Sequence, residues 1–190
     1  MSDKSAFDKR ENQFEAEYFN RKDAEQIAKL KAVFQAKADK EGISKATGVT
    51  DEKLLDRMLG LQLSGDLMAA FQLYPLIEVA WADGTLDDGE TAAVLAAAEK
   101  RGIAKDSKAH AFLSERLSAG PSKDLHSIWL MYAGQLKTSL SAADLDAFRA
   151  DVFELCRSVA QSSGGMIGKA FSVSGAEKSV LAEVEKALTR

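Results

Sequence analysis

The stretch that decides the fold is Leu73–Gly102, LYPLIEVAWADGTLDDGETAAVLAAAEKRG. Its first part, Pro75–Ala82, carries one charged residue, Glu78, and a helix that is apolar on nearly every face belongs in the centre of a core. Pro75 suits the first turn of a helix, where its missing N–H is not needed. A segment this short cannot cross a bilayer. We therefore expect a buried helix in the middle of an all-α domain.

The second part of this hairpin is expected to be a helix of small residues. Thr91–Lys100 is mostly alanine, the strongest helix former, and Gly102 suits the position just after a helix end. Alanine side chains let a neighbouring helix approach closely. The hairpin therefore favours a compact helical bundle.

The segment between the two helices, Asp83–Glu90, holds four carboxylates. Asp87 can cap the second helix, with Glu90 three residues later completing a capping box. Clustered carboxylates can also bind a hard divalent cation. The EF-hand pattern does not fit, because Asp88 stands at its sixth position instead of Gly and Val94 at its twelfth instead of Glu. Helix capping and cation binding both remain open, with capping favoured.

The composition limits the class of protein. The chain has 190 residues, 46% of them hydrophobic, two prolines and no alternating β-branched runs, which indicates one all-α domain with an appendage. A net charge of −4 disfavours nucleic-acid binding. No signal peptide or long apolar run is present, and the single Cys156 cannot form an internal disulfide. We expect a cytoplasmic protein without an integral membrane segment, and peripheral membrane association stays open.

Residues 1–41 are expected to form a charged helical arm. No Pro or Gly interrupts residues 5–40, and the apolar residues fall on two different faces rather than one stripe. One face holds Phe7, Phe14 and Tyr18; the other holds Phe19, Ile27, Leu30, Val33 and Phe34. The arm either packs on its own domain or binds a protein partner, and self-association into a homo-oligomer is a further alternative. Residues 42–50 (GISKATGVT) are the expected linker, and residues 51–190 the domain.

The C-terminal half predicts further helices with recognisable starts. Ser122 is expected to cap a helix that buries Leu125, Ile128, Trp129, Tyr132 and Leu136, and Ser141 with Asp144 opens the next. Residues 161–174 form a glycine-rich connection that lacks the phosphate-loop pattern, and its Met166, Ile167 and Phe171 are expected to enter the core. Ser174 and Glu177 then form a second capping box. We therefore expect two helix–loop–helix units that face each other.

Two quoted stretches carry a family resemblance. VAWADGTLDDGE (79–90) and SGGMIGKAFSVSGAEKSVLAEVEKAL (163–188) resemble the tellurite-resistance TerB-like family, over about residues 54–188. The resemblance implies a compact all-helical fold and a role in stress-response or envelope-associated assemblies without a known catalytic reaction. It also implies a divalent cation (Ca, Mg, Mn or Zn) bound through acidic loops. Carried over, the ligands are Asp83, Asp87 and Glu90 in the first loop and Glu177 in the second.

The arm has a second, shorter resemblance. Phe7-Asp8-Lys9-Arg10-Glu11 with Phe14-Glu15-Ala16 is similar to the start of the ATPase-inhibitor zeta subunits of bacterial F-type ATP synthases. The similarity covers about ten residues, and it implies only that the arm contacts a partner.

Catalytic patterns are sparse. His110 and His126 are the only histidines, and neither belongs to a metalloprotease motif. Cys156 lies on an apolar helix face, which indicates a buried small hydrophobe. Glu78 is expected to reach solvent or to pair with Arg or Lys; alternatively it joins Asp83 and Glu90 around a polar pocket.

These observations leave two main hypotheses and one minor hypothesis. The first, which we favour, is a noncatalytic TerB-like stress-response module for binding or scaffolding, with a partner-binding arm. The second is a metal-assisted enzyme that uses the Asp83–Glu90 carboxylates, which would need converging ligands and an open coordination position. The third is an ATPase regulator that acts through the arm.

Overall fold

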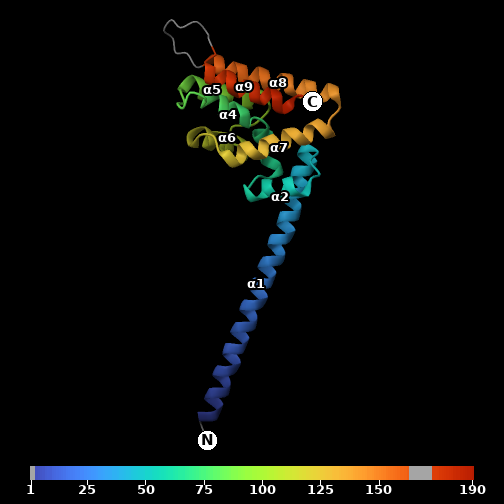
Figure 1. Cartoon of the computed structure of the whole chain (residues 1–190). Coiled ribbons are helices and arrows are strands. Elements are labelled where there is room, and N and C mark those ends of the chain that lie inside the picture. The colour runs from blue at the N-terminus through green and yellow to red at the C-terminus, as the bar shows by residue number, and fades with distance from the viewer. Residues whose placement is uncertain (1–2, 163–172) are drawn as a thin grey trace. The chain divides into compact units, whose positions relative to one another are not determined.

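The computed structural model describes the backbone of residues 3–162 and 173–190, and the side chains of residues 21–22, 24–162 and 173–190. All elements in these ranges are helical, which confirms the all-α prediction (Figure 1). The chain divides into two units, residues 1–39 and residues 40–190. The helices are α1 (Asp3–Thr47), α2 (Glu52–Gly60), the 3₁₀ turn η1 (Gly65–Leu67), α3 (Met68–Gln72), α4 (Tyr74–Ala80), α5 (Asp88–Lys100), α6 (Lys108–Ala119), α7 (Lys123–Ser139), α8 (Ala142–Ser162) and α9 (Gly175–Leu188).

Helix α4 lies at the centre of the compact unit, as its sequence predicts. Every residue of α4 except Glu78 is buried, and Pro75 lies in its first turn. The helix packs against α5, α8 and α9 (Figure 1). Because α4 is short and apolar on all sides, its burial by several neighbours provides most of its stability.

Helix α5 packs closely on α8, which its small residues allow. Val94, Ala97 and Ala98 are buried. At Gly89 a Cβ atom would stand 2.8 Å from the backbone oxygen of Ser162, so only glycine permits this approach without a shift. Gly102, with φ of +80°, follows the helix end as predicted.

The two predicted helix–loop–helix units are α4–α5 and α8–α9, and they pack against each other. Helix α8 contacts α4 and α5, and α4 also contacts α9. Each second helix starts with a complete capping box, formed by Asp87 with Glu90 in α5 and by Ser174 with Glu177 in α9. The predicted core positions of residues 166, 167 and 171 lie outside the described residues.

The expected linker over residues 42–50 differs from the structure. Helix α1 continues through Thr47, and Ile43 and Val49 are completely buried in the core. Gly42 is helical and packs against Gly65, whose Cβ would stand 2.8 Å from the carbonyl carbon of Gly42. The glycine that suggested a linker thus serves a close backbone contact instead.

No helix in the part of the chain that the structure describes has the length and apolar character needed to cross a membrane.

Candidate functional site

The acidic loop before α5 uses its carboxylates to satisfy backbone amides. Asp83 Oδ1 accepts hydrogen bonds from the Thr85 amide and hydroxyl, both at 2.9 Å, and these bonds lower the pKa of Asp83. Asp87 Oδ1 accepts from the Glu90 amide at 2.7 Å, and Glu90 Oε2 accepts from the Asp87 amide at 3.0 Å. The capping prediction is therefore confirmed in both directions of the box.

Glu90 is a buried carboxyl group with a raised pKa. Its side chain is 3% exposed, and burial, the first cause, raises its pKa to about 7. The negative charges of Asp87, Asp83 and Glu177 raise the pKa of Glu90 further. The second capping glutamate, Glu177, is also buried.

Bringing carboxylates together is not the same as forming a cation site. Among the described residues, no group of three or more His, Cys, Asp or Glu side chains is arranged to hold a metal ion. The oxygens of Asp83, Asp87, Glu90 and Glu177 are instead held by local amide groups. The divalent cation stays a prediction, which calorimetric titration of wild type and Asp83→Asn/Glu90→Gln tests.

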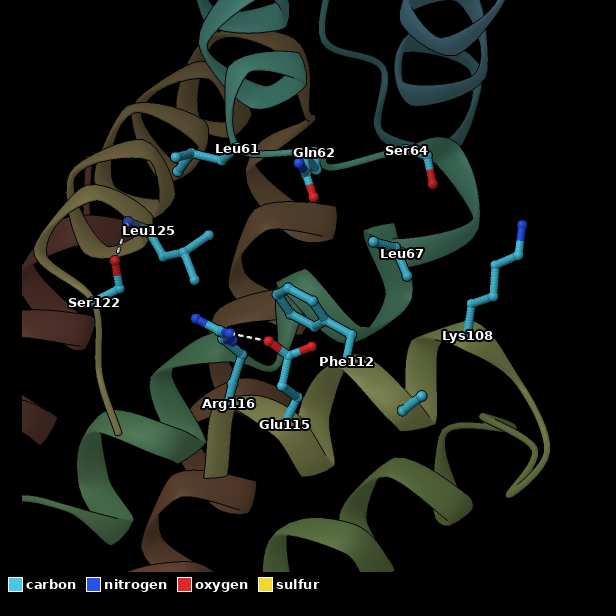
Figure 2. Close-up of a pocket in the computed structure, with 11 residues that line it drawn as sticks. Leu61, Gln62, Ser64, Leu67, Lys108, Phe112, Glu115, Arg116, Ser122 and Leu125 are labelled. Atoms are coloured by element: carbon cyan, nitrogen blue, oxygen red, sulfur yellow. Dashed lines mark hydrogen bonds and ion pairs between the residues drawn. The ribbon is translucent and has the colours of Figure 1, made fainter. Parts of the chain in front are cut away.

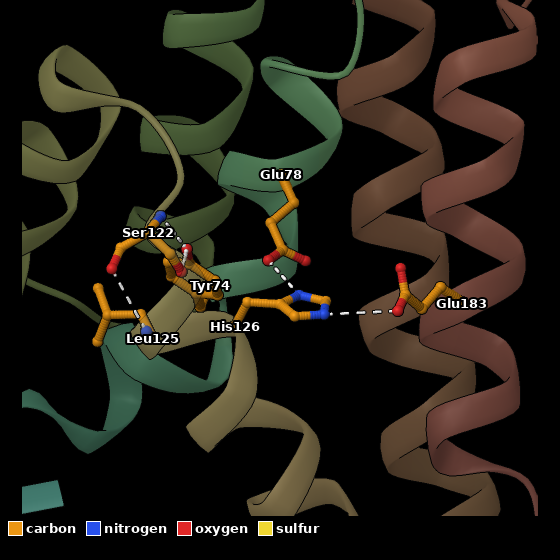
Figure 3. A network of polar contacts seen from close by, with 6 residues as sticks. All are labelled: Tyr74, Glu78, Ser122, Leu125, His126 and Glu183. Atoms are coloured by element: carbon orange, nitrogen blue, oxygen red, sulfur yellow. Dashed lines mark hydrogen bonds and ion pairs between the residues drawn. The ribbon is translucent and has the colours of Figure 1, made fainter.

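Glu78 has a partner that the sequence did not suggest. Its Oε1 lies 2.7 Å from His126 Nδ1, and the other ring nitrogen, Nε2, lies 3.4 Å from Glu183 Oε1 (Figure 3). Burial raises the pKa of Glu78, and His126 opposes that shift. The contact joins α4, α7 and α9, so Glu78 pairs with a histidine rather than with Arg or Lys.

A second buried polar contact lies beside this one. The Tyr74 hydroxyl donates to the Ser122 carbonyl at 2.9 Å and accepts from the Ser122 amide at 2.6 Å (Figure 3). Burial raises the pKa of Tyr74 to about 12, so the phenol stays neutral. The contact fixes the start of α7 on α4. Its function is structural.

A pocket of about 490 Å³ opens between the turn after α2, helix α6 and the start of α7 (Figure 2). Leu67, Phe112 and Leu125 contribute apolar surface, and Arg116 pairs with Glu115 at one side. The volume lies within the range of small-molecule sites. Its lining residues include no histidine or cysteine, and they offer no nucleophile with an adjacent base. The sequence did not reveal this pocket, because its walls come from three separate segments.

The single cysteine is inert in the structure. Cys156 is completely buried, and burial raises the pKa of its thiol well above the usual range. It is therefore a small core residue, as predicted.

The arm, in contrast, exposes apolar side chains. Ile27, Leu30 and Phe34 are 52%, 58% and 70% exposed, and Val33 is 66% exposed. At about 100° per residue, the first three lie within a sector of roughly 60° on α1. We call Ile27, Leu30 and Phe34 the apolar stripe. The side chains of the other predicted face, Phe7, Phe14 and Tyr18, lie outside the described residues.

No protein-family model, curated protein or solved structure matches this chain. Membership of the TerB-like family therefore stays a prediction from the quoted motifs.

Proposed function

We propose that this chain is a noncatalytic helical binding module whose N-terminal arm binds a protein partner. The apolar stripe carries the proposal. Most large apolar residues of the compact unit are buried, yet Ile27, Leu30 and Phe34 each leave half or more of their surface exposed. A contiguous group of this kind marks an interaction surface.

The spacing of the stripe suits binding as a helix. Its members follow the i, i+3, i+7 spacing with which an amphipathic helix anchors in an apolar groove. Covering these three side chains would remove several hundred Å² of apolar surface from water, at about 25 cal/mol per Å². The stripe is too short for a sustained coiled coil.

The loop carboxylates of the compact unit support a binding role over a metal-assisted reaction, because they cap the starts of α5 and α9. The sequence resemblance to TerB-like proteins supports a stress-response setting for the partner.

Affinity capture with two matched triple variants tests the proposal. Ile27→Ser/Leu30→Ser/Phe34→Ser removes the stripe, whereas Ala28→Ser/Ala32→Ser/Ala36→Ser changes the opposite face of the same segment. We expect wild type and the second variant to capture the same discrete protein, and the first variant to lose it. Equal capture by all three would contradict the proposal. Circular dichroism of each variant confirms that the helix content is kept.

A further inference from the structure

The charges around the apolar stripe indicate which kind of side chain its protein partner presents. Residues 26–38, QIAKLKAVFQAKA, contain Lys29, Lys31 and Lys37 and no acidic residue, although the whole chain has a net charge of −4. The side chains of residues 26–38 are all exposed. The stripe therefore lies in a locally basic segment of an acidic protein.

Two of these lysines border the stripe. At about 100° per residue, Lys31 lies just beyond Ile27 on one side, and Lys37 lies just beyond Leu30 on the other. Lys29 lies farther round the helix. This places one ammonium group along each edge of the apolar surface, where a partner's rim would meet it.

We propose that the partner presents an apolar groove whose two edges carry carboxylates. This inference rests on the proposed function, and it names the chemistry of the protein that the arm binds. Lys31 and Lys37 pair with acidic side chains at the rim, while Ile27, Leu30 and Phe34 fill the groove. Rim charges of this kind select the partner and its orientation more than they add affinity.

Three surfaces in the described part of the chain, the arm over residues 26–38 and two apolar hollows, do not offer that chemistry to a second copy. Two arms paired through residues 26–38 would bring lysines together, which is repulsive. The pocket beside α6 carries Lys108 and Arg116 with one acidic residue, Glu115. The apolar groove between α8 and α9 carries Arg157 and Lys178 with one acidic residue, Glu185. Neither surface complements a basic helix.

A charge-swap experiment with synthetic peptides tests the inference. The probes are two synthetic helical-hairpin peptides whose paired helices enclose the same leucine-lined groove, edged by glutamates in one peptide and by lysines in the other. The full chain is compared with Lys31→Glu/Lys37→Glu and with the control Lys22→Glu/Lys29→Glu, which makes the same charge change away from the stripe. Fluorescence anisotropy measures each affinity at low and high salt.

We expect wild type and the control to bind the glutamate peptide about tenfold more tightly than the lysine peptide, and Lys31→Glu/Lys37→Glu to reverse that order. High salt should reduce the preference. Equal binding of both peptides, or binding of neither, overturns the inference. So does binding of the full chain to phosphatidylcholine–phosphatidylglycerol vesicles that needs the stripe and outcompetes the peptides, because the partner would then be a lipid surface. Capture that depends on the stripe without any charge preference would leave the proposed function standing and reject only this inference.

Discussion

At the scale of single residues, Glu90 combines two roles that oppose each other. It completes the cap of α5, yet its burial raises its pKa from an ordinary value near 4.5 to about 7. A raised carboxyl pKa means that the folded state holds its proton more tightly than the unfolded state. The proton on Glu90 therefore stabilises the folded state fully below about pH 4.5, and this stabilisation is lost as the pH rises through about 7.

Glu90→Gln should remove this pH dependence, because glutamine still accepts the Asp87 amide without a charge. We expect the variant to be more stable than wild type by about 2 kcal/mol at pH 8 and by little at pH 4.5. Urea unfolding at both pH values measures this. Asp88→Asn, a change at an exposed neighbour, should show no such difference between the two pH values. An equal effect of Glu90→Gln at both pH values would contradict the explanation.

The contact between Glu78 and His126 should be measurable as a coupling. Removing His126 leaves a mostly buried carboxylate without its partner, so we expect His126→Ala to cost about 1–3 kcal/mol. A double-mutant cycle with Glu78→Ala should give a coupling of about 1 kcal/mol. The parallel cycle with Glu183→Ala should give a few tenths of a kcal/mol, because Glu183 is half exposed and 3.4 Å away. Additive effects in the first cycle would show that the contact adds no stability.

Glu90 and Glu78 show which contacts can be predicted from sequence and which cannot. The capping role of Glu90 was readable, because a capping box depends on residues three apart in the chain. The pairing of Glu78 was not, because His126 is 48 residues away and reaches α4 only after α7 has folded beside it. Local hydrogen bonds leave a pattern in sequence, whereas contacts between distant helices do not.

At the scale of elements, the end of α1 is held by a contact between two glycines. Gly65→Ala would place a Cβ atom 2.8 Å from the backbone carbon of Gly42, so the helix end or the η1 turn must move. We expect a loss of about 1–3 kcal/mol in the free energy of unfolding. The control is Gly60→Ala at the end of α2, where nothing lies within 4 Å of the new atom. That variant should keep or slightly raise the stability, and equal losses in both would contradict the assigned contact.

The same contact explains why the linker was predicted in the wrong place. Gly42 and Gly48 resembled a flexible connection. From sequence alone, a glycine that makes the backbone flexible cannot be told from one that lets another backbone segment approach closely. Ile43 and Val49 carried the opposite signal, since both are apolar, but a stretch so short shows no clear period. The all-α fold and the central hairpin were predictable because their periodicity extends over many residues.

At the scale of the whole molecule, the two units should be separable at residue 40. Among the side chains that the structure describes, residues 1–39 include none that is buried in the core, so we expect their removal to change the free energy of unfolding by less than about 0.5 kcal/mol. Removing residues 1–50 takes away Ile43 and Val49 and should cost about 3 kcal/mol or more. Chemical denaturation of both shortened chains measures this. Equal stability of the two shortened chains would contradict this expectation and would favour a linker over residues 42–50, as the sequence predicted.

The proposed function also belongs to this scale, because it assigns binding to the arm and leaves the compact unit as its support. The proposal assigns the partner contact to the apolar stripe and not to the opposite face of α1. A test must therefore compare two faces of one helix within the same chain.

The most direct measurement is photo-cross-linking in the source cells with a benzoylphenylalanine placed at position 34 or at position 32. Phe34 belongs to the apolar stripe, and Ala32 lies on the opposite face of α1. We predict a discrete adduct from position 34 and none from position 32. Adducts of equal yield from both positions, or none from either, would contradict the claim that the apolar stripe binds a protein partner.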